Sequence, residues 1–484
     1  MTRGLDALVS APPVAAVRDA LGERSGAAWL VGGTVRDALL GRDVRDVDIA
    51  VDGSPEEAAR IVARAVGGTA FRLSESFGAW RAINPRDGWI CDVSRLQAAT
   101  IESDLELRDF SVNAMAVPMA GEAPELIDPA GGARDLDRRV LRVLGGPDVP
   151  SSSFARDPLR PLRLARLATE LGFEPDPASE RLTRDAAPGV AGASAERIFA
   201  ELRRIVIADA VLEGLALAGR LGLVAVVLPE LDALHGVEQS PYHHLDVHGH
   251  TIEVLRRYLE IERDPEETLG GLGREVAAAL AEPLADELTR GQALRFGALL
   301  HDLGKPQTRK VLPGGRISFI GHDSVGAEMV AGVCRRMRTS ERLRTYLAAL
   351  TRHHLVLGFM VHERPLSRAA VYRYLTTCRP VELEVTVLSC ADRLATRGRN
   401  ADVAIAAHLE VARELTADAL DWRRDGSPQP PIRGDELARE LGLPTGPEIG
   451  SLLARLREAA FTGEVRTRED ALALARRLRQ NPGS

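Results

Sequence analysis

The hydrophobic pattern of the chain changes near residue 145, and this change most limits the folds that the chain can adopt. Before that point, short apolar runs at 28–31 and 47–51 alternate with stretches of helical periodicity, as expected of a sheet covered by helices. From about Phe154 onward, the Leu-, Ala- and Arg-rich pattern is helical almost throughout. We therefore expect an α/β head followed by mostly α-helical domains.

The length of 484 residues is more than one hydrophobic core usually organises, so we expect several domains. The Pro-rich run 427–431 is typical of a linker. The predicted domains are a head at 1–145, a helical neck at 146–215, a third helical domain at 216–425 and a helical tail at 426–484.

Turn and apolar signals predict further elements. In the head we expect a strand at 89–93, a helix from about Asp109 and a strand that ends at Ile127. In the third domain, the segment 263–289 has many acidic and few bulky residues. We expect it to be a solvated helical insertion.

Composition limits the environment of the protein. The longest apolar runs are far shorter than the roughly 20 residues of a membrane-spanning helix. The N-terminus lacks the pattern of a secretory signal, and the 4 cysteines form no CxxC pair. We therefore expect a cytoplasmic protein with no membrane partner. The net charge of −7 does not exclude nucleic-acid binding, because such surfaces are local.

Two aspartates and a glycine pair are the first candidates for chemistry. Asp46 and Asp48 lie two residues apart on a predicted strand, so their carboxylates face one side and can share a Mg²⁺ ion. Gly32 and Gly33 stand before a predicted helix, where backbone N–H groups can approach a phosphate. Arg36 adds a cation one turn later. Metal, phosphate cradle and cation are the parts that phosphoryl transfer needs.

Joined as Leu30-Val-Gly-Gly-Thr-Val-Arg-Asp-Ala-Leu-Leu-Gly41 and Asp46-Val-Asp48, these residues resemble the DNA polymerase β-like nucleotidyltransferases. More narrowly, they resemble the class II branch, which holds bacterial CCA-adding enzymes and poly(A) polymerases. The resemblance implies two-metal phosphoryl transfer with Mg²⁺. It also implies that Asp46, Asp48 and Asp92 are catalytic, with Asp92 in the place of the third acidic residue of the family.

Later motifs follow in the order of that family. Arg108-Asp-Phe-Ser-Val-Asn-Ala-Met115 is similar to the second motif, whose arginine contacts the triphosphate and whose aspartate contacts the ribose. Asp157-Pro-Leu-Arg160-x-Leu-Arg163 resembles the fourth, in which an aspartate and an arginine pair with the incoming base. This role is chemically sensible, because Asp accepts from the exocyclic amine of cytosine or adenine and Arg donates to ring acceptors. The nucleotide-binding residues that the resemblance implies are Gly32, Gly33, Arg36, Arg108, Asp109, Asn113, Asp157, Arg160, Arg163 and Arg166.

The chain departs from the family pattern at three places. Arg156 stands where the fourth motif has Glu, and Leu107 precedes Arg108 where a second arginine is usual. Between Arg95 and Asp104 the chain is shorter than in typical CCA-adding relatives, which hold a loop there that helps to switch specificity from C to A. Family members that add only CC have this loop shortened. Addition of CCA and addition of CC alone both stay open, with poly(A) synthesis as the alternative.

Histidines and acidic residues of the third domain form a second pattern. An adjacent His-Asp pair stands in the apolar segment Leu300-His-Asp-Leu-Gly-Lys305. Burying a carboxylate beside an imidazole is costly unless something coordinates both. Mixed nitrogen and oxygen ligands suit a divalent transition metal such as Mn²⁺ or Ni²⁺. The pattern resembles the HD phosphohydrolase superfamily, and the ligands implied are His250, His301, Asp302, His322, His354 and Asp392. Spacing alone does not choose between His353 and His354.

The tail and the substrates complete the resemblance. Ile432-Arg-Gly-Asp-Glu-Leu and Gly446-Pro-Glu-Ile-Gly450 are similar to the C-terminal RNA-binding region of the CCA-adding enzymes. The implied partners are tRNA, CTP and ATP, and the HD domain is expected to be a phosphodiesterase or phosphatase. An HD phosphohydrolase whose head only binds nucleotides is a further alternative. The sequence leaves open whether the protein is a monomer or a dimer.

Overall fold

The structure is a computed structural model that describes residues 2–74, 78–121, 124–145, 153–239, 244–397 and 401–480. The chain divides into two compact units, Met1–Val227 and Leu228–Ser484, and each is described by itself. The first holds a sheet with helices and the second is mostly helical, which confirms the expected fold class. The division into four domains stays a prediction.

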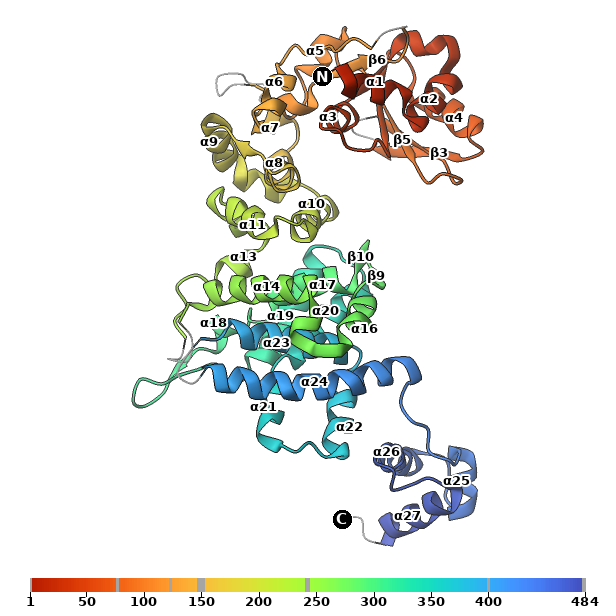
Figure 1. The fold of residues 1–484 in the computed structure, drawn as a ribbon, viewed down its shortest axis with the longest axis vertical. Coiled ribbons are helices and arrows are strands. Elements are labelled where there is room, and N and C mark those ends of the chain that lie inside the picture. Colours follow the sequence, from red (N-terminus) through yellow and green to blue (C-terminus); the bar gives the residue numbers. More distant parts are fainter. Residues whose placement is uncertain are drawn as a thin grey trace. The chain divides into compact units, whose positions relative to one another are not determined.

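A six-stranded sheet in the described residues organises the first unit (Figure 1). The strands follow the order β3-β4-β5-β2-β1-β6, and all neighbours are antiparallel except β2 and β5. The predicted strands 28–31 and 47–51 have the predicted bounds, whereas the one at 89–93 lies at 90–95. The strands are β1 Ala28–Val31, β2 Val47–Val51, β3 Thr69–Ser74, β4 Ala79–Ile83, β5 Ile90–Arg95 and β6 Ala116–Pro118.

Helices cover this sheet. α4 shows why they form: the Ser54 hydroxyl accepts a hydrogen bond from the backbone N–H of Glu57 at 3.2 Å, and Pro55 begins the first turn. The face of α4 that carries Ala59 and Val62 is buried and packs on β3, β4 and β5. The helices of this part are α1 Thr2–Ser10, α2 Pro12–Leu21, α3 Gly33–Leu39, α4 Pro55–Ala65, α5 Ile101–Leu105 and α6 Gly132–Asp137.

The predicted helix from Asp109 was wrong. Phe110 is extended and forms a β-bridge with Val143, so the chain makes only a 3₁₀ turn at Ser111–Asn113. The expected strand ending at Ile127 is reduced to a single bridge between Ile127 and Ala116.

Helices α7 to α12 complete the first unit. α8 packs against α10 and α11, and Gly214 of α11 permits the close approach. A Cβ at Gly214 would lie 2.3 Å from Oγ1 of Thr169, so no larger residue fits there without a shift. The helices are α7 Ser153–Arg156, α8 Arg160–Leu171, α9 Pro177–Ala186, α10 Ala195–Ile207, α11 Val211–Arg220 and α12 Leu223–Val227, and the short strands β7 Val140–Leu141 and β8 Glu174–Pro175 pair in parallel.

The second unit is built around α14, α17 and α23, which pack on one another, and the pair α19 and α20 joins them through α17 (Figure 1). Its helices before the tail are α13 Pro229–Asp232, α14 Val247–Arg263, α15 Pro265–Leu269, α16 Gly273–Leu280, α17 Arg290–Leu300, α18 Lys305–Thr308, α19 His322–Arg336, α20 Glu341–His353, α21 Val356–Met360, α22 Arg368–Thr377, α23 Glu382–Ala395 and α24 Ala401–Asp425. Two hairpins pair β9 Pro283–Ala285 with β10 Leu288–Thr289, and β11 Lys310–Val311 with β12 Ile317–Ser318.

The segment 263–289 is not a solvated insertion. Leu269, Val276 and Leu280 are buried, and the segment ends in the β9–β10 hairpin beside α17. Most of its bulky residues are spaced so that they face the core, which a count of residue types does not reveal.

The tail contains α25 Gly434–Leu441, α26 Pro447–Thr462 and α27 Arg468–Gln480. These helices share an apolar cluster in which Leu437, Leu456 and Ala471 are fully buried. None of the described helices is long and apolar enough to cross a membrane.

Candidate active sites in the two units

Three carboxylates lie at one cavity beside the sheet. In the parallel pair of β2 and β5, Asp48 lies beside Asp92, and neighbouring side chains of paired strands point to the same side. Asp46 precedes β2 and lies two residues from Asp48. All three line a cavity of about 730 Å³. The structure therefore brings together the three predicted catalytic residues.

The environment of Asp48 favours the binding of a cation beside its carboxylate. Burial and the charge of Asp92 raise the pKa of Asp48 to about 6, although Arg108 and Arg36 oppose this shift. A carboxylate whose ionised form is disfavoured by its neighbours gains from an added positive charge. Three oxygen-bearing groups at one cavity are the donor set that Mg²⁺ prefers. Asp46 and Asp48 thus fit the predicted divalent metal.

Arg81 is a member of this site that the sequence did not single out. It lies opposite Asp92 in the antiparallel pair of β4 and β5. Its Nε and Nη2 donate to the two carboxylate oxygens of Asp92 at 2.7 and 2.8 Å. Arg81 and Asp92 face each other only because β4 and β5 pair in this register, and the sequence pattern does not show that register.

The glycine turn lies against the carboxylate of Asp48. Gly32 has a φ of 64°, and a Cβ there would lie 3.2 Å from Nη1 of Arg108. The Thr34 hydroxyl accepts from the backbone N–H of Asp48 at 2.7 Å and donates to the carbonyl of Asp46 at 3.3 Å. Thr34 therefore ties the start of α3 to β2, a role that the sequence pattern did not indicate.

Asp109 is the centre of a buried network. Its Oδ1 accepts from the Asn113 amide at 2.9 Å, and its Oδ2 accepts from Nη1 of Arg163 at 3.1 Å. Burial alone would raise the pKa of Asp109, but the charges of Arg163 and Arg160 and the hydrogen bond from Asn113 lower it to about 2. The carboxylate is therefore ionised and held in place.

Other predicted arginines are also held by neighbours. Nη1 of Arg36 donates to Oδ1 of Asn113 at 2.7 Å, which joins α3 to the turn after Asp109. Arg166 bonds to Glu201 and is buried, so it braces α8 against α10.

Asp157 and Arg160 are engaged within the protein. Asp157 accepts from Arg197 at 2.6 Å and from the backbone N–H of Leu159 at 3.1 Å. Arg160 donates to the Ser153 hydroxyl at 2.6 Å. Arg160 lines a cavity of about 330 Å³ together with Asp48 and Asp92, whereas Asp157 is not among the described residues that line it. A base in this cavity could therefore reach Arg160, which lines it.

The connection after β5 is short and fixed. The N–H of Leu96 donates to the carbonyl of Val51 at 3.1 Å, and that of Gln97 donates to Oδ1 of Asp104 at 2.7 Å. Asp104 in turn accepts from Arg108 at 3.3 Å. Residues 96–100 thus run directly from β5 into α5.

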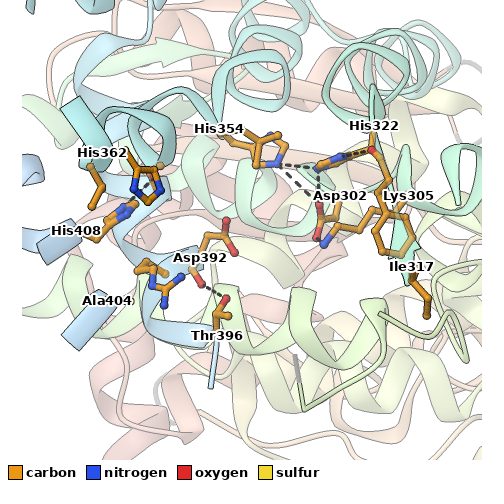
Figure 2. Close-up of a pocket in the computed structure, with 16 residues that line it drawn as sticks. Asp302, Lys305, Ile317, His322, His354, His362, Asp392, Thr396, Ala404 and His408 are labelled. Carbon is orange, nitrogen blue, oxygen red and sulfur yellow. Dashed lines mark hydrogen bonds and ion pairs between the residues drawn. The ribbon is translucent and has the colours of Figure 1, made fainter. Parts of the chain in front are cut away.

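A second cluster lies in the second unit. Nε2 of His301 lies 3.1 Å from Oδ2 of Asp302, and Nε2 of His322 lies 3.4 Å from Oδ1. His354 approaches the same Oδ1 at 3.9 Å, and both rings point toward Asp302 (Figure 2). Asp302 therefore belongs to two groups of ligand atoms that could each hold a metal ion, one with His250 and His301 and one with His322 and His354.

Asp392 closes the cluster from α23. Its Oδ1 lies 3.0 Å from Nε2 of His250. Both Asp392 and Asp302 line a cavity of about 490 Å³ with His322 and His354. The six residues predicted as ligands thus lie together.

The histidine tautomers fit a bound cation. Nδ1 of His301, His322 and His354 lies 2.6–2.9 Å from a backbone carbonyl, which can only accept. In its neutral form, each ring therefore carries its proton on Nδ1 and leaves Nε2 as an acceptor. Burial, and the positive charge that His301 and His322 carry when protonated, lower the pKa of His354 to about 4, so the His354 ring is neutral. Nε2 of His322 and His354 are 3.2 Å apart, and a shared metal ion would resolve this contact.

The structure distinguishes the neighbouring histidines. His354 is buried in the cluster, whereas His353 is the last residue of α20 and only half-buried. His248 stacks on His235 instead of joining the cluster.

Two residues that line this cavity were not predicted from the sequence as members of the site. Nζ of Lys305 lies 2.7 Å from Oδ2 of Asp302 and donates to Gln239 at 2.7 Å. His408 of α24 is buried and contacts the Ser389 hydroxyl at 3.1 Å. Lys305 follows the His-Asp pair in sequence and could have been noted, whereas nothing near His408 signals its position.

Comparisons with known proteins agree with this geometry. The Poly A polymerase head domain family matches residues 28–97 and 81–142, and the HD domain family matches residues 247–397. A third family, "Probable RNA and SrmB- binding site of polymerase A", matches residues 172–234.

Related proteins cover nearly the whole chain. An A-adding tRNA nucleotidyltransferase of Deinococcus radiodurans is 35% identical over 94% of this chain and 97% of its own. A CC-adding tRNA nucleotidyltransferase of Thermus thermophilus is 34% identical over 92% of each chain. The Thermotoga maritima CCA-adding enzyme complexed with tRNA has a similar fold, with a TM-score of 0.60 at 22% identity over 98% of this chain and 97% of that one. The protein therefore belongs to the tRNA nucleotidyltransferase and poly(A) polymerase family, and it is a nucleotidyltransferase that carries an HD domain.

Proposed function

We propose that the first unit adds cytidine residues to the 3′ end of tRNA, with CTP as the donor. The observation that supports this most is the row of Asp46, Asp48 and Asp92 at a cavity that arginines also line. Nucleotidyl transfer needs carboxylates for the metal and cations for the triphosphate, and this face offers both. A tRNA substrate would place the protein in the cytoplasm.

Each group has a part in the proposed reaction. Asp46 and Asp48 would hold Mg²⁺, in the two-metal arrangement expected of the family, and the metal would offset the charge on the triphosphate. Arg108 and the backbone at Gly32 would contact the phosphates. Asp92 would accept the proton that the ribose 3′-hydroxyl loses as it attacks the α-phosphorus, and pyrophosphate would leave.

Base selection would use Asp157 and Arg160. Cytosine offers an exocyclic amine to Asp157 and a ring acceptor to Arg160, which uracil cannot match. Because Asp157 is paired with Arg197 and Arg160 with Ser153, the base would have to take over bonds that now lie within the protein.

The relatives are named for the addition of different nucleotides, so the nucleotide that this protein adds is inferred from its own residues. At residues 96–100, where typical CCA-adding relatives hold the loop that helps to switch specificity from C to A, the connection is short and fixed. We therefore infer that the product ends in CC.

The test of this specificity is to offer ATP to a tRNA that already ends in CC. Addition of A at a rate comparable to that of C would contradict this specificity, and a long run of A would indicate a poly(A) polymerase.

We also propose that the HD domain hydrolyses phosphate esters, such as a 2′,3′-cyclic phosphate at an RNA end. Its support is the convergence of ligands on Asp302 beside the cavity that Lys305 lines. The ligand chemistry suits Mn²⁺ or Ni²⁺. Protein loaded with either ion should hydrolyse the ester, and His301→Ala should not. No turnover with any divalent ion would reduce this domain to a structural role.

A further inference from the structure

The pairing of Arg81 with Asp92 assigns a role to a residue outside the known motifs. The register aligns Asp48, Asp92 and Arg81 across β2, β5 and β4, so their side chains share one face of the sheet. We propose that Arg81 is a positioning residue for nucleotidyl transfer, which acts by holding the Asp92 carboxylate. This inference rests on the proposed function of the same site.

The geometry of the pair determines the orientation of the carboxylate. Two parallel N–H donors on two oxygens fix the plane of the group, which a single contact would not do. Each carboxylate oxygen keeps a second lone pair, so Asp92 can still accept a proton from the attacking hydroxyl. Without Arg81, repulsion from Asp48 would favour rotamers of Asp92 that point away from the reacting atoms.

The scaffold around Arg81 is rigid. β4 is hydrogen-bonded between β3 and β5, and Ala82, the next residue along β4, is fully buried. Trp80, on the face opposite Arg81, lies under the guanidinium of Arg60 of α4 at 5.5 Å. The pair itself is partly open, with Arg81 30% and Asp92 25% exposed, so its effect on folding stability should be small.

The test is a double-mutant cycle. Arg81→Gln and Asp92→Asn are compared alone and together in single-turnover addition of CMP to tRNA that lacks its CCA end. Because a misplaced catalytic group can cost on the order of 100-fold in rate, Arg81→Gln alone should slow the reaction about 10–100-fold. It should leave the calorimetric affinity for CTP within about twofold, and it should have no further effect in the Asp92→Asn background.

Two further variants separate geometry from charge. Arg81→Lys keeps the charge but cannot donate two parallel bonds, so it should recover only part of the rate. Arg86→Gln, at an exposed position between β4 and β5, is the matched control and should behave as the wild type. Melting temperatures of all variants should agree within about 3 °C, as expected for a partly exposed pair.

The outcomes are distinguishable. Wild-type protein that adds no CMP would refute the proposed function. Wild-type activity together with an equal loss from Arg81→Gln in both backgrounds would overturn the inference, because Arg81 would then act independently of Asp92. A weakened affinity for CTP would overturn it as well, since Arg81 would then bind the substrate directly.

Discussion

Asp46 and Asp48 allow the most direct test of the first site. The β2–β5 register places Asp48 beside Asp92, and Asp46 lies two residues before Asp48 at the same cavity. Asp46→Ala or Asp48→Ala should abolish CMP addition and leave the fold intact. Incorporation of radiolabelled CTP, with circular dichroism for the fold, checks this. Near-normal incorporation by either variant would mean that the metal is held elsewhere.

The pKa of Asp109 predicts how the free energy of unfolding depends on pH. Its pKa of about 2 in the folded protein lies below the unfolded value of about 3.9, so the ionised form favours folding. The contribution, about 2–3 kcal/mol, is present above pH 4 and is lost as the pH falls through about 2, with roughly half lost by pH 3.

Urea unfolding of the wild type and of Asp109→Asn tests this. Trp29, Trp80 and Trp89 lie in the first unit and report on it by fluorescence. The difference in unfolding free energy between the two proteins should shrink from pH 7 to pH 3. A difference that does not change with pH would contradict the role given to the Asp109 charge.

Site residues that belong to a short motif could be predicted from the sequence. Asp46 with Asp48, and His301 with Asp302, are recognisable within a few positions, and the structure brings each pair to a cavity. Arg81 and His408 were missed because their partners, Asp92 and Ser389, are set by strand register and helix packing. Pair interactions of that kind leave no periodic pattern.

At the scale of elements, Gly304 shows how close packing holds the HD site. It lies between the His-Asp pair and α18, and a Cβ there would be 2.2 Å from the carbonyl of His322. Gly304→Ala must therefore separate α18 from α19 and move His322 away from Asp302. Ester hydrolysis should fall by at least about 10-fold, since small displacements of catalytic groups are costly.

Gly332→Ala is the control for this prediction. Gly332 lies on the same helix α19, and the nearest atom to its Cβ would be Nη2 of Arg335 at 3.9 Å. Hydrolysis with Mn²⁺ should be unchanged in this variant. Equal activity of both variants would show that the contact between α18 and α19 does not set the site.

Elements with a strong local pattern could be predicted, whereas those set by distant contacts could not. β1 and β2 have the expected bounds because each is a short apolar run between turns. The helix expected from Asp109 does not form because Phe110 pairs with Val143, a contact that local propensity cannot report. β3 and β4 were missed because polar residues interrupt their apolar pattern.

At the scale of the whole molecule, the two sites lie in different compact units. Their chemistry should therefore be separable. His301→Ala should abolish ester hydrolysis and leave CMP addition within about twofold of the wild type, because the effects of substitutions add when their residues share no partners. Asp48→Ala should do the reverse. Assays of both activities on both variants check this, and a parallel loss of both activities would show that the units are coupled.

The most direct test of the central claim is the identity of the nucleotides added to tRNA. A tRNA that ends before CCA is incubated with CTP alone, with ATP alone and with both, and its 3′ ends are sequenced. We predict two C residues with CTP, no addition with ATP alone, and the same CC end when both are present. Addition of A alone, or no extension with any nucleotide, would contradict the proposal that this protein adds cytidine to tRNA.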